Sequence, residues 1–292
     1  MRLWRALRHR AWPFLREVVW RFNDDQGTVL AGYLAYSAML SFMPFLIFAT
    51  ALTGFIVGPQ EGRAALDLLF EAVPEHVART LEPVILEVIG QRRGGILTLS
   101  ALGALWAASN GIEALRVGLD HAYDVDESRH VALSRAIAIL VVLAGFLIFV
   151  ALGVLIILAP LAFRLVEAWA GIDVPAGADI ARYAVAIAIL WSALWMVHRF
   201  LPSRPMRGFA LWPGILASML IWVMMATAFS IYLSYTPFYS VTYGTLAGVI
   251  LTLLFFYLTG VALIFGAQVN ATANARRMAA TTGGSDGAPV DA

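Results

Sequence analysis

The composition of this 292-residue chain is that of a membrane protein. Hydrophobic residues make up 61% of it and charged residues 13%, and its mean hydropathy is +0.79. Water-soluble domains average about 45–50% apolar and about 25% charged residues, so this chain has too few charges to cover a surface in water. The absence of Cys excludes disulfides, thiolate metal sites and Cys nucleophiles. The net charge of +1 points to no particular partner.

Residues 1–27 predict a basic amphipathic helix. Its apolar residues recur at three- and four-residue spacing: Trp4, Leu7, Ala11, Phe14, Leu15, Val18 and Phe22. Its Arg residues fall mostly elsewhere on the helix. This pattern is typical of a helix that lies on an anionic membrane leaflet, with Trp12 and Trp20 as further anchors. A solvated basic tail is the alternative interpretation.

Uncharged stretches further along the chain are long enough to cross a bilayer, which takes about 20 residues per helix. We expect transmembrane helices at 28–57, 94–115, 134–161, 180–201, 209–233 and 243–270. The last two divide a single run without charge, 208–275, which we expect to turn around 234–237. The predicted fold class is therefore all-α, a polytopic membrane helical bundle of about six transmembrane helices within a domain at 28–277.

The remaining segments fix the predicted topology. Residues 58–93 mix charged and apolar residues, and Pro74 and Pro83 divide them into short pieces, which predicts a periplasmic helical cap. Residues 278–292 predict a disordered cytoplasmic tail. Placing both termini in the cytoplasm puts most of the Arg residues inside, as expected for a bacterial inner (plasma) membrane.

Small residues predict where helices touch. Gly103, Ala107 and Gly111 share one stripe of the second predicted span, and Gly244 and Gly248 have a G-x-x-x-G spacing near the start of the last. Such residues let helix backbones approach closely. We expect helix contacts at both stripes.

Polar residues within the spans are the candidate functional residues, because lipid makes them costly unless they face water or a polar partner. Two interpretations are open: hydrogen bonds that lock the bundle, or a polar cavity that opens to the cytoplasm. In the second interpretation, the cavity or gate is formed by Tyr36, Ser37, Pro44, Asn110, Glu113, Tyr243, Gln268 and Asn270. Arg116 and Asp120 stand four residues apart, so they can pair near the inner interface.

Enzyme chemistry is hard to find in the sequence. The His residues are scattered over loops and helix ends, and no metal-ligand spacing, phosphate loop or nucleophile elbow is present. An acidic group on the inner side either binds a metal or consists of solvated loop charges; its members are Asp24, Asp25, Asp120, Asp124 and Asp126. We favour solvated charges, and we expect no catalytic residue, no metal and no cofactor.

Three stretches resemble the YihY/BrkB family of bacterial inner-membrane proteins: AGYLAYSAMLSFMPFL (31–46), GALWAASNGIEALRVGLDHAYDV (103–125) and YGTLAGVILTLLFFYLTGVALIFGAQVNA (243–271). The resemblance covers residues 20–277 and implies a six-helix fold. Gln268 departs from the pattern, because the family usually has Glu there, and Asp120 stands where Asn is usual. An activity that needs a carboxylate at 268 would be absent here.

The resemblance also implies a function. Family members are often labelled ribonuclease BN, which we interpret as a misassignment, because the sequence has no metal-binding cluster and no extended RNA-binding surface. Other members are linked to virulence and to export of envelope lipid or lipopolysaccharide. We therefore expect a transporter or transport-assisting protein for an envelope lipid or another amphipathic substrate. The alternatives are a non-catalytic membrane scaffold for envelope assembly and a membrane-bound hydrolase. The expected partners are membrane lipids, lipopolysaccharide precursors and a second copy of the chain, but not nucleic acid.

Overall fold

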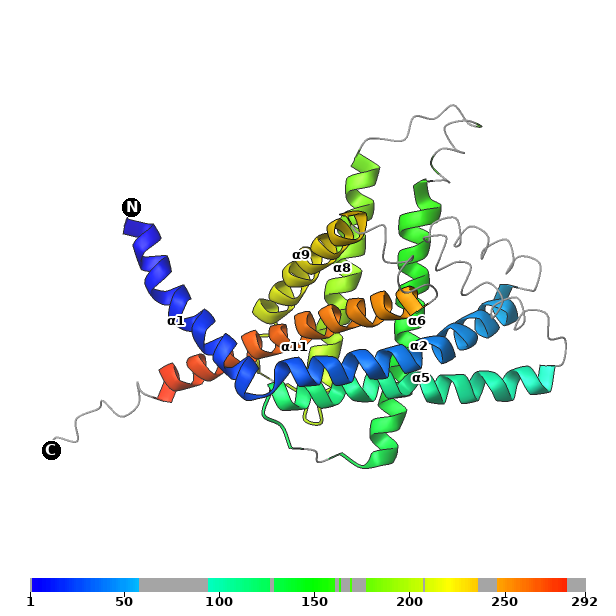
Figure 1. Ribbon diagram of the computed structural model, residues 1–292, viewed down its shortest axis with the longest axis horizontal. Helices are drawn as coiled ribbons and strands as arrows, with labels where there is room; N and C mark the ends of the chain where they lie inside the picture. Colours follow the sequence, from blue (N-terminus) through cyan, green and yellow to red (C-terminus); the bar gives the residue numbers. More distant parts are fainter. Residues whose placement is uncertain are drawn as a thin grey trace. The chain divides into compact units, whose positions relative to one another are not determined.

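The computed structural model describes residues 2–57, 94–126, 129–160, 163, 169, 177–206, 208–235 and 246–282. Within these ranges the regular structure is entirely helical (Figure 1). The helices are α1 (Arg2–Asp24), α2 (Gly27–Val57), α5 (Gly94–Ala122), α6 (Val131–Gly153), α8 (Gly177–Phe200), α9 (Trp212–Tyr235) and α11 (Leu246–Thr282), and a π-helical segment, η1 (Val154–Leu158), continues α6. The predicted all-α fold class is confirmed.

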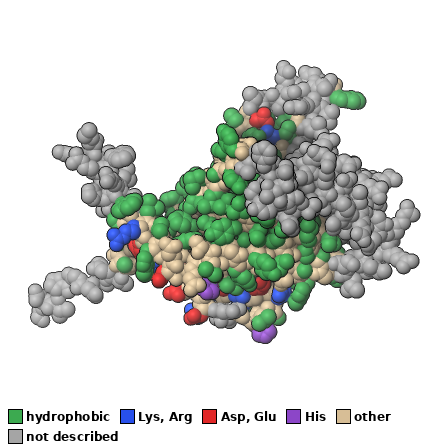
Figure 2. Space-filling view, viewed as in Figure 1, with side chains coloured by type: hydrophobic (Ala, Val, Ile, Leu, Met, Phe, Trp, Pro, Cys, Tyr) green, Lys and Arg blue, Asp and Glu red, His purple; other side chains and the backbone are tan. Residues whose placement is uncertain are grey.

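Five segments of these helices are long and apolar enough to cross a membrane: Gly27–Ala49, Val131–Ile156, Gly177–Phe200, Trp212–Tyr235 and Ala247–Ala280. Hydrophobic side chains cover much of the surface visible in Figure 2. α5 is not among the five: the side chains that the structure describes in it run from Ala101 to Ala122 and include Glu113, Arg116 and Asp120. The polytopic helical bundle is therefore supported, while the number of six spans and the position of the termini stay predictions.

Most helix ends fall close to the predicted ones, with two differences. α5 continues to Ala122 and α11 to Thr282, past the predicted ends at 115 and 270. Residues 278–282, predicted as the start of the tail, are thus helical. The predicted cap at 58–93 lies outside the described residues, as do residues 283–292 of the predicted tail.

The chain divides into two compact units. Unit 1 consists of 1–36, 114–129 and 195–292, and unit 2 consists of 37–113 and 130–194. α2, α5 and α8 each contribute one part to either unit, so the polar ends of α5 and α8 belong to unit 1 and their other parts to unit 2.

Unit 2 is held by an apolar cluster from α2, α5 and α6. The rings of Phe48 and Phe146 meet edge to face, with centroids 6.1 Å apart, and both side chains are buried. Nearby, the Ser41 hydroxyl donates a hydrogen bond to the Ala107 carbonyl oxygen at 3.3 Å. A Cβ on Gly111 would lie 3.3 Å from Ser41 Cβ. The predicted contact at Ala107 and Gly111 is therefore present.

Unit 1 is held by a close approach of α9 and α11. A Cβ added to Gly214 would overlap the Gly266 carbonyl oxygen, and one added to Gly266 would overlap Ser218 Oγ. The two backbones therefore touch without intervening side chains, which only glycine allows. α2 also meets α11 closely, since a Cβ on Gly260 would lie 3.2 Å from the Ala31 carbonyl oxygen.

The contacts predicted at Gly103 and Gly248 are not present within the described part of the chain. A Cβ at either position would have no described atom within 4 Å. The reason is that a stripe of small residues shows that close approach is permitted, whereas the position of the neighbouring helix decides where it occurs. Gly244 lies outside the described residues.

Replacing Gly266 should destabilise unit 1. In Gly266→Ala, we expect the added methyl group to separate α9 from α11 and to lower the free energy of unfolding by about 1–3 kcal/mol, as overpacking does. The matched control is Gly248→Ala, on the same helix but with no described atom within 4 Å of the added Cβ. Thermal unfolding of both variants in detergent checks this, and equal melting temperatures would contradict the packing described.

Candidate functional site

Buried polar side chains gather in unit 1 where α5, α8 and α11 carry their polar ends. Asp120 accepts hydrogen bonds from the Ser203 backbone N–H (2.7 Å) and hydroxyl (2.6 Å), and it pairs with Arg116 at 3.1 Å. Arg116 also donates to Ser203 Oγ at 2.8 Å. The predicted pair of Arg116 and Asp120 is thus confirmed. Because a buried carboxylate is costly unless it is paired and hydrogen-bonded, these bonds fasten the segment after α8 to α5.

A second group of hydrogen bonds links the turn after α5 with α8, α9 and α11. Asn270 Oδ1 accepts from the Gly214 backbone N–H at 2.7 Å, which fixes Asn270 Nδ2 as the donor to the Tyr123 hydroxyl at 3.2 Å. The Tyr123 hydroxyl lies 2.8 Å from His198 Nδ1. The donor and acceptor roles in this contact depend on the tautomer of His198.

Tyr123 takes part in this group as a protonated phenol. It follows α5 in a turn and its side chain is buried. Burial raises the pKa of the Tyr123 phenol well above its ordinary value, and the hydrogen bond with Asn270 lowers it by a smaller amount. The phenol therefore keeps its proton at physiological pH, and its hydrogen bond to the imidazole is kept as well.

A third contact joins the turn between α1 and α2 to α11. Gln268 Nε2 donates to Asp25 Oδ2 at 2.5 Å, while the buried Gln268 Oε1 has no partner among the described residues. Three further buried polar atoms of unit 1 likewise lack one there: His198 Nε2, Ser218 Oγ and Thr272 Oγ1. Some polar atoms of this network are thus hydrogen-bonded within unit 1, whereas these four buried atoms have no partner among the described residues.

Two of the predicted cavity residues belong to this network and the others lie elsewhere. Gln268 and Asn270 are fully buried in unit 1, whereas Tyr36, also in unit 1, has 60% of its side chain exposed. Four others belong to unit 2: Ser37, Pro44, Asn110 and Glu113. Tyr243 lies outside the described residues. A cavity shared by all eight stays a prediction.

Asn110 has a partner of its own within unit 2. Its Oδ1 accepts from Arg135 Nη1 at 2.8 Å, and the same nitrogen donates to Ser109 Oγ at 2.7 Å. The Arg135 guanidinium also lies over the Trp106 ring, 4.6 Å from its centroid. Asn110 itself is exposed, so this group lies at the surface of unit 2.

Tyr123, His198 and Ser203 were not predicted as site residues. The His residues were expected on loops and helix ends; His198 does lie near the end of α8, but it is fully buried. The available signal was a His directly after the apolar run of a predicted span, where burial in the bundle competes with exposure at the interface.

Two members of the predicted acidic group have partners in unit 1, because Asp25 binds Gln268 and Asp120 binds Arg116. Within the described part of the chain, no three His, Asp or Glu residues could together hold a metal ion.

Comparison with known proteins identifies the family. A family model described as virulence factor BrkB matches residues 18–290. The chain belongs to the BrkB family. Among its relatives, the ribonuclease-like protein YfkH of Bacillus subtilis is 31% identical over 275 residues, which covers 90% of this chain and 96% of YfkH. No solved structure matches this BrkB-family chain.

Other relatives of this BrkB-family chain carry a name that states only a membrane location. A UPF0761 membrane protein of Pseudoalteromonas translucida is 26% identical, with 86% of this chain and 82% of that protein covered. Another, of Aeromonas salmonicida, is 25% identical, with 91% and 90% covered. These names indicate a membrane protein family and say nothing about activity.

Removing Asn270 should cost far more stability than removing Asn110. Asn270→Ala leaves the buried Gly214 N–H without an acceptor, so we expect a loss of about 1–3 kcal/mol. Asn110→Ala gives up a bond at an exposed side chain, so we expect less than about 1 kcal/mol. Thermal unfolding in detergent compares the two. Equal losses would mean that the network in unit 1 contributes no more than a surface contact.

Proposed function

We propose that this BrkB-family membrane protein is a transporter or transport-assisting protein that acts on an envelope lipid or another amphipathic substrate. The observation that carries the proposal is the set of four buried polar atoms in unit 1, on Gln268, Thr272, Ser218 and His198, that have no partner among the described residues. Buried polar atoms in proteins nearly always have one. In a membrane bundle, such uncommitted groups are typical of a path for a polar ligand.

The chemistry of these atoms fits a polar headgroup. Gln268 Oε1 accepts hydrogen bonds, the hydroxyls of Ser218 and Thr272 both donate and accept, and His198 Nε2 donates or accepts according to its tautomer. A substrate hydroxyl can donate to Gln268 Oε1, and phosphate oxygens can accept from the Ser218 and Thr272 hydroxyls. The apolar outer faces of the helices suit the acyl chains of such a substrate. On α9, for example, Leu220 is 62% exposed. A polar interior beside apolar helix faces supports an amphipathic substrate, whose acyl chains stay in lipid.

The cellular setting forms part of the proposal. We place the protein in the bacterial inner membrane with both termini in the cytoplasm, because the distribution of Arg favours that orientation. Its partners would be membrane lipids and envelope lipid or lipopolysaccharide precursors, with a homo-oligomer as a possible assembly. Nucleic acid is not among the proposed partners, and we propose no enzymatic activity. The word ribonuclease in the name of YfkH is a statement about that relative.

A non-transporting scaffold for envelope assembly is the second candidate. The observation that favours it is that Gln268 and Asn270 are fully buried and hydrogen-bonded within unit 1, as residues that lock a bundle would be. A scaffold needs a rigid bundle and no specific lipid. The recovery of lipid with the purified protein therefore separates the two candidates.

Mass spectrometry of lipids that copurify with the protein tests the proposal. We expect one amphipathic lipid class to be enriched over the bulk membrane, and we expect Thr272→Val to lower that enrichment about five-fold, the value of one hydrogen bond. Thr272→Val removes a hydroxyl that has no partner among the described residues, so we expect the fold to be kept.

The control for this measurement is Thr252→Val on the same helix. The Thr252 hydroxyl is already engaged, because it donates to the Gly248 carbonyl of its own helix at 2.8 Å, so enrichment should stay as in the wild type. A lipid profile identical to that of the bulk membrane would overturn the transport proposal and favour the scaffold.

A further inference from the structure

Part of the apolar stripe of α1 predicted to lie on the membrane, Val18 and Phe22, packs on α11 instead. Val18 is fully buried, and the ring of Phe22 lies 5.7 Å from that of Phe265. Beside them, Arg276 donates to Glu17 Oε2 from Nε at 2.8 Å and from Nη2 at 2.6 Å. The side of α1 left for other contacts is therefore the opposite one.

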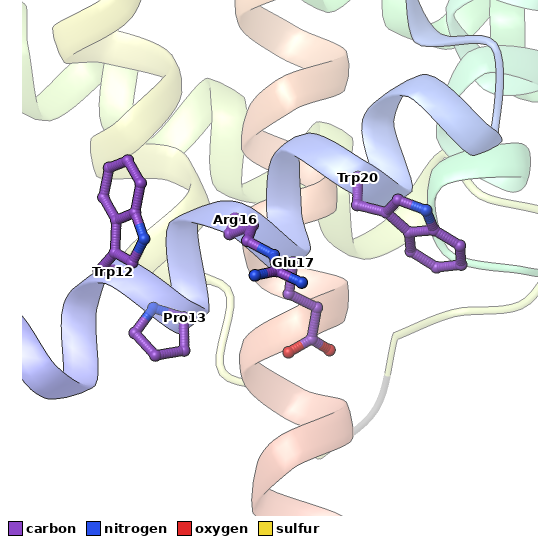
Figure 3. Close-up of a pocket in the computed structure, with 5 residues that line it drawn as sticks. All are labelled: Trp12, Pro13, Arg16, Glu17 and Trp20. Carbon is purple, nitrogen blue, oxygen red and sulfur yellow. The ribbon is translucent and has the colours of Figure 1, made fainter.

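That opposite side is apolar with one charge at its centre. Trp12 is 68% exposed and Trp20 62%, and Leu15 and Val19 beside them are also exposed. Arg16 stands four residues from each Trp, so the three side chains share one face of the helix. We call Trp12, Arg16 and Trp20 the α1 triad. Figure 3 shows the triad along one side of α1, where it lines a pocket of about 530 Å³ together with Pro13 and Glu17.

The charge in this pocket is positive and available. Arg16 makes no ion pair with the side chains that the structure describes. The carboxylate of Glu17, which also lines the pocket, is already paired with Arg276 and lies 3.6 Å from Arg21. An anion at Arg16 therefore meets an uncompensated guanidinium, a group whose planar fork suits phosphate oxygens.

The position of α1 on α11 points to lipid as the occupant. Arg276 is the first charged residue after the uncharged run 208–275, so it marks the end of the apolar part of α11. Glu17 binds Arg276, which places the middle of α1 at the level of the membrane surface. Trp prefers this level, because its ring is apolar and its N–H is polar. A face with two exposed indoles around one cation matches the boundary between acyl chains and anionic headgroups.

We propose that the α1 triad is a binding site for the headgroup phosphate of an anionic phospholipid in the adjacent membrane leaflet. Arg16 binds the phosphate, and the indoles of Trp12 and Trp20 lie on either side of it at headgroup depth. The contacts of Glu17 and Phe22 with α11 fix this site to a transmembrane helix. The site goes beyond the proposed function, because it requires no movement of lipid across the membrane.

A single labelled Cys can report lipid at the triad, since the natural chain contains none. The full-length Val19→Cys protein carries a fluorophore next to Arg16 and is placed in phosphatidylcholine nanodiscs with phosphatidylglycerol as a minor component. A nitroxide near the headgroup is attached either to phosphatidylglycerol or to phosphatidylcholine. At equal nitroxide content we expect stronger quenching by phosphatidylglycerol. We expect Arg16→Gln to lower this preference about five-fold, the effect of one basic residue at a membrane surface.

The matched control is Arg204→Gln, which removes an exposed Arg from the segment after α8 and should leave the preference unchanged. Equal quenching by the two lipids in the wild-type background would overturn the proposal. An Arg16→Gln protein that keeps the preference would also overturn it. If neither lipid reaches the fluorophore, a protein surface covers this face and the site is not a lipid site. Thr272→Val should not alter this readout, so its outcome is separate from that of the transport proposal.

Discussion

The structure depends on one constraint: lipid cannot satisfy a hydrogen bond, so polar groups within the spans must find partners inside the protein. Unit 1 meets the constraint by collecting polar side chains from distant parts of the chain. Asp120 holds the segment after α8, and Asn270 accepts from the backbone of α9 while donating to the turn after α5. The same constraint gives meaning to the buried atoms that have no partner among the described residues. In a lipid environment, a buried polar atom without a hydrogen bond costs free energy, which is a reason to look for a ligand that binds there.

Backbone packing and the polar network support each other. Gly214 and Gly266 bring α9 and α11 into direct contact, and only at this spacing does the Gly214 N–H reach Asn270. α1 is attached to the same helix further along, where Glu17 meets Arg276. α11 thus carries the close helix contact, the buried network and the anchor for the α1 triad.

The fold class could be predicted from the sequence because composition and uncharged run lengths report the solvent in which a chain folds. The pair of Arg116 and Asp120 could be predicted too, since helix geometry alone places such residues together. Long-range partners could not. Nothing local distinguishes Gly266, which touches a neighbour, from Gly248, whose Cβ position has no described atom within 4 Å. The stripe containing Val18 and Phe22 was correctly recognised as apolar, but an apolar stripe fits a helix as well as a leaflet. Gln268 and Asn270 were identified as polar residues in an apolar span, yet their partners, Asp25 and Tyr123, lie far away in sequence.

Accessibility to water of Leu220→Cys in intact membranes tests most directly the claim that lipid covers the apolar helix faces. Leu220 is 62% exposed in the folded chain, so protein alone does not hide it. We predict that a water-soluble maleimide labels Arg204→Cys readily, in membranes opened to both sides, and labels Leu220→Cys only after detergent is added. Rapid labelling of Leu220→Cys in the membrane would contradict the account, because the face of α9 would then be in water.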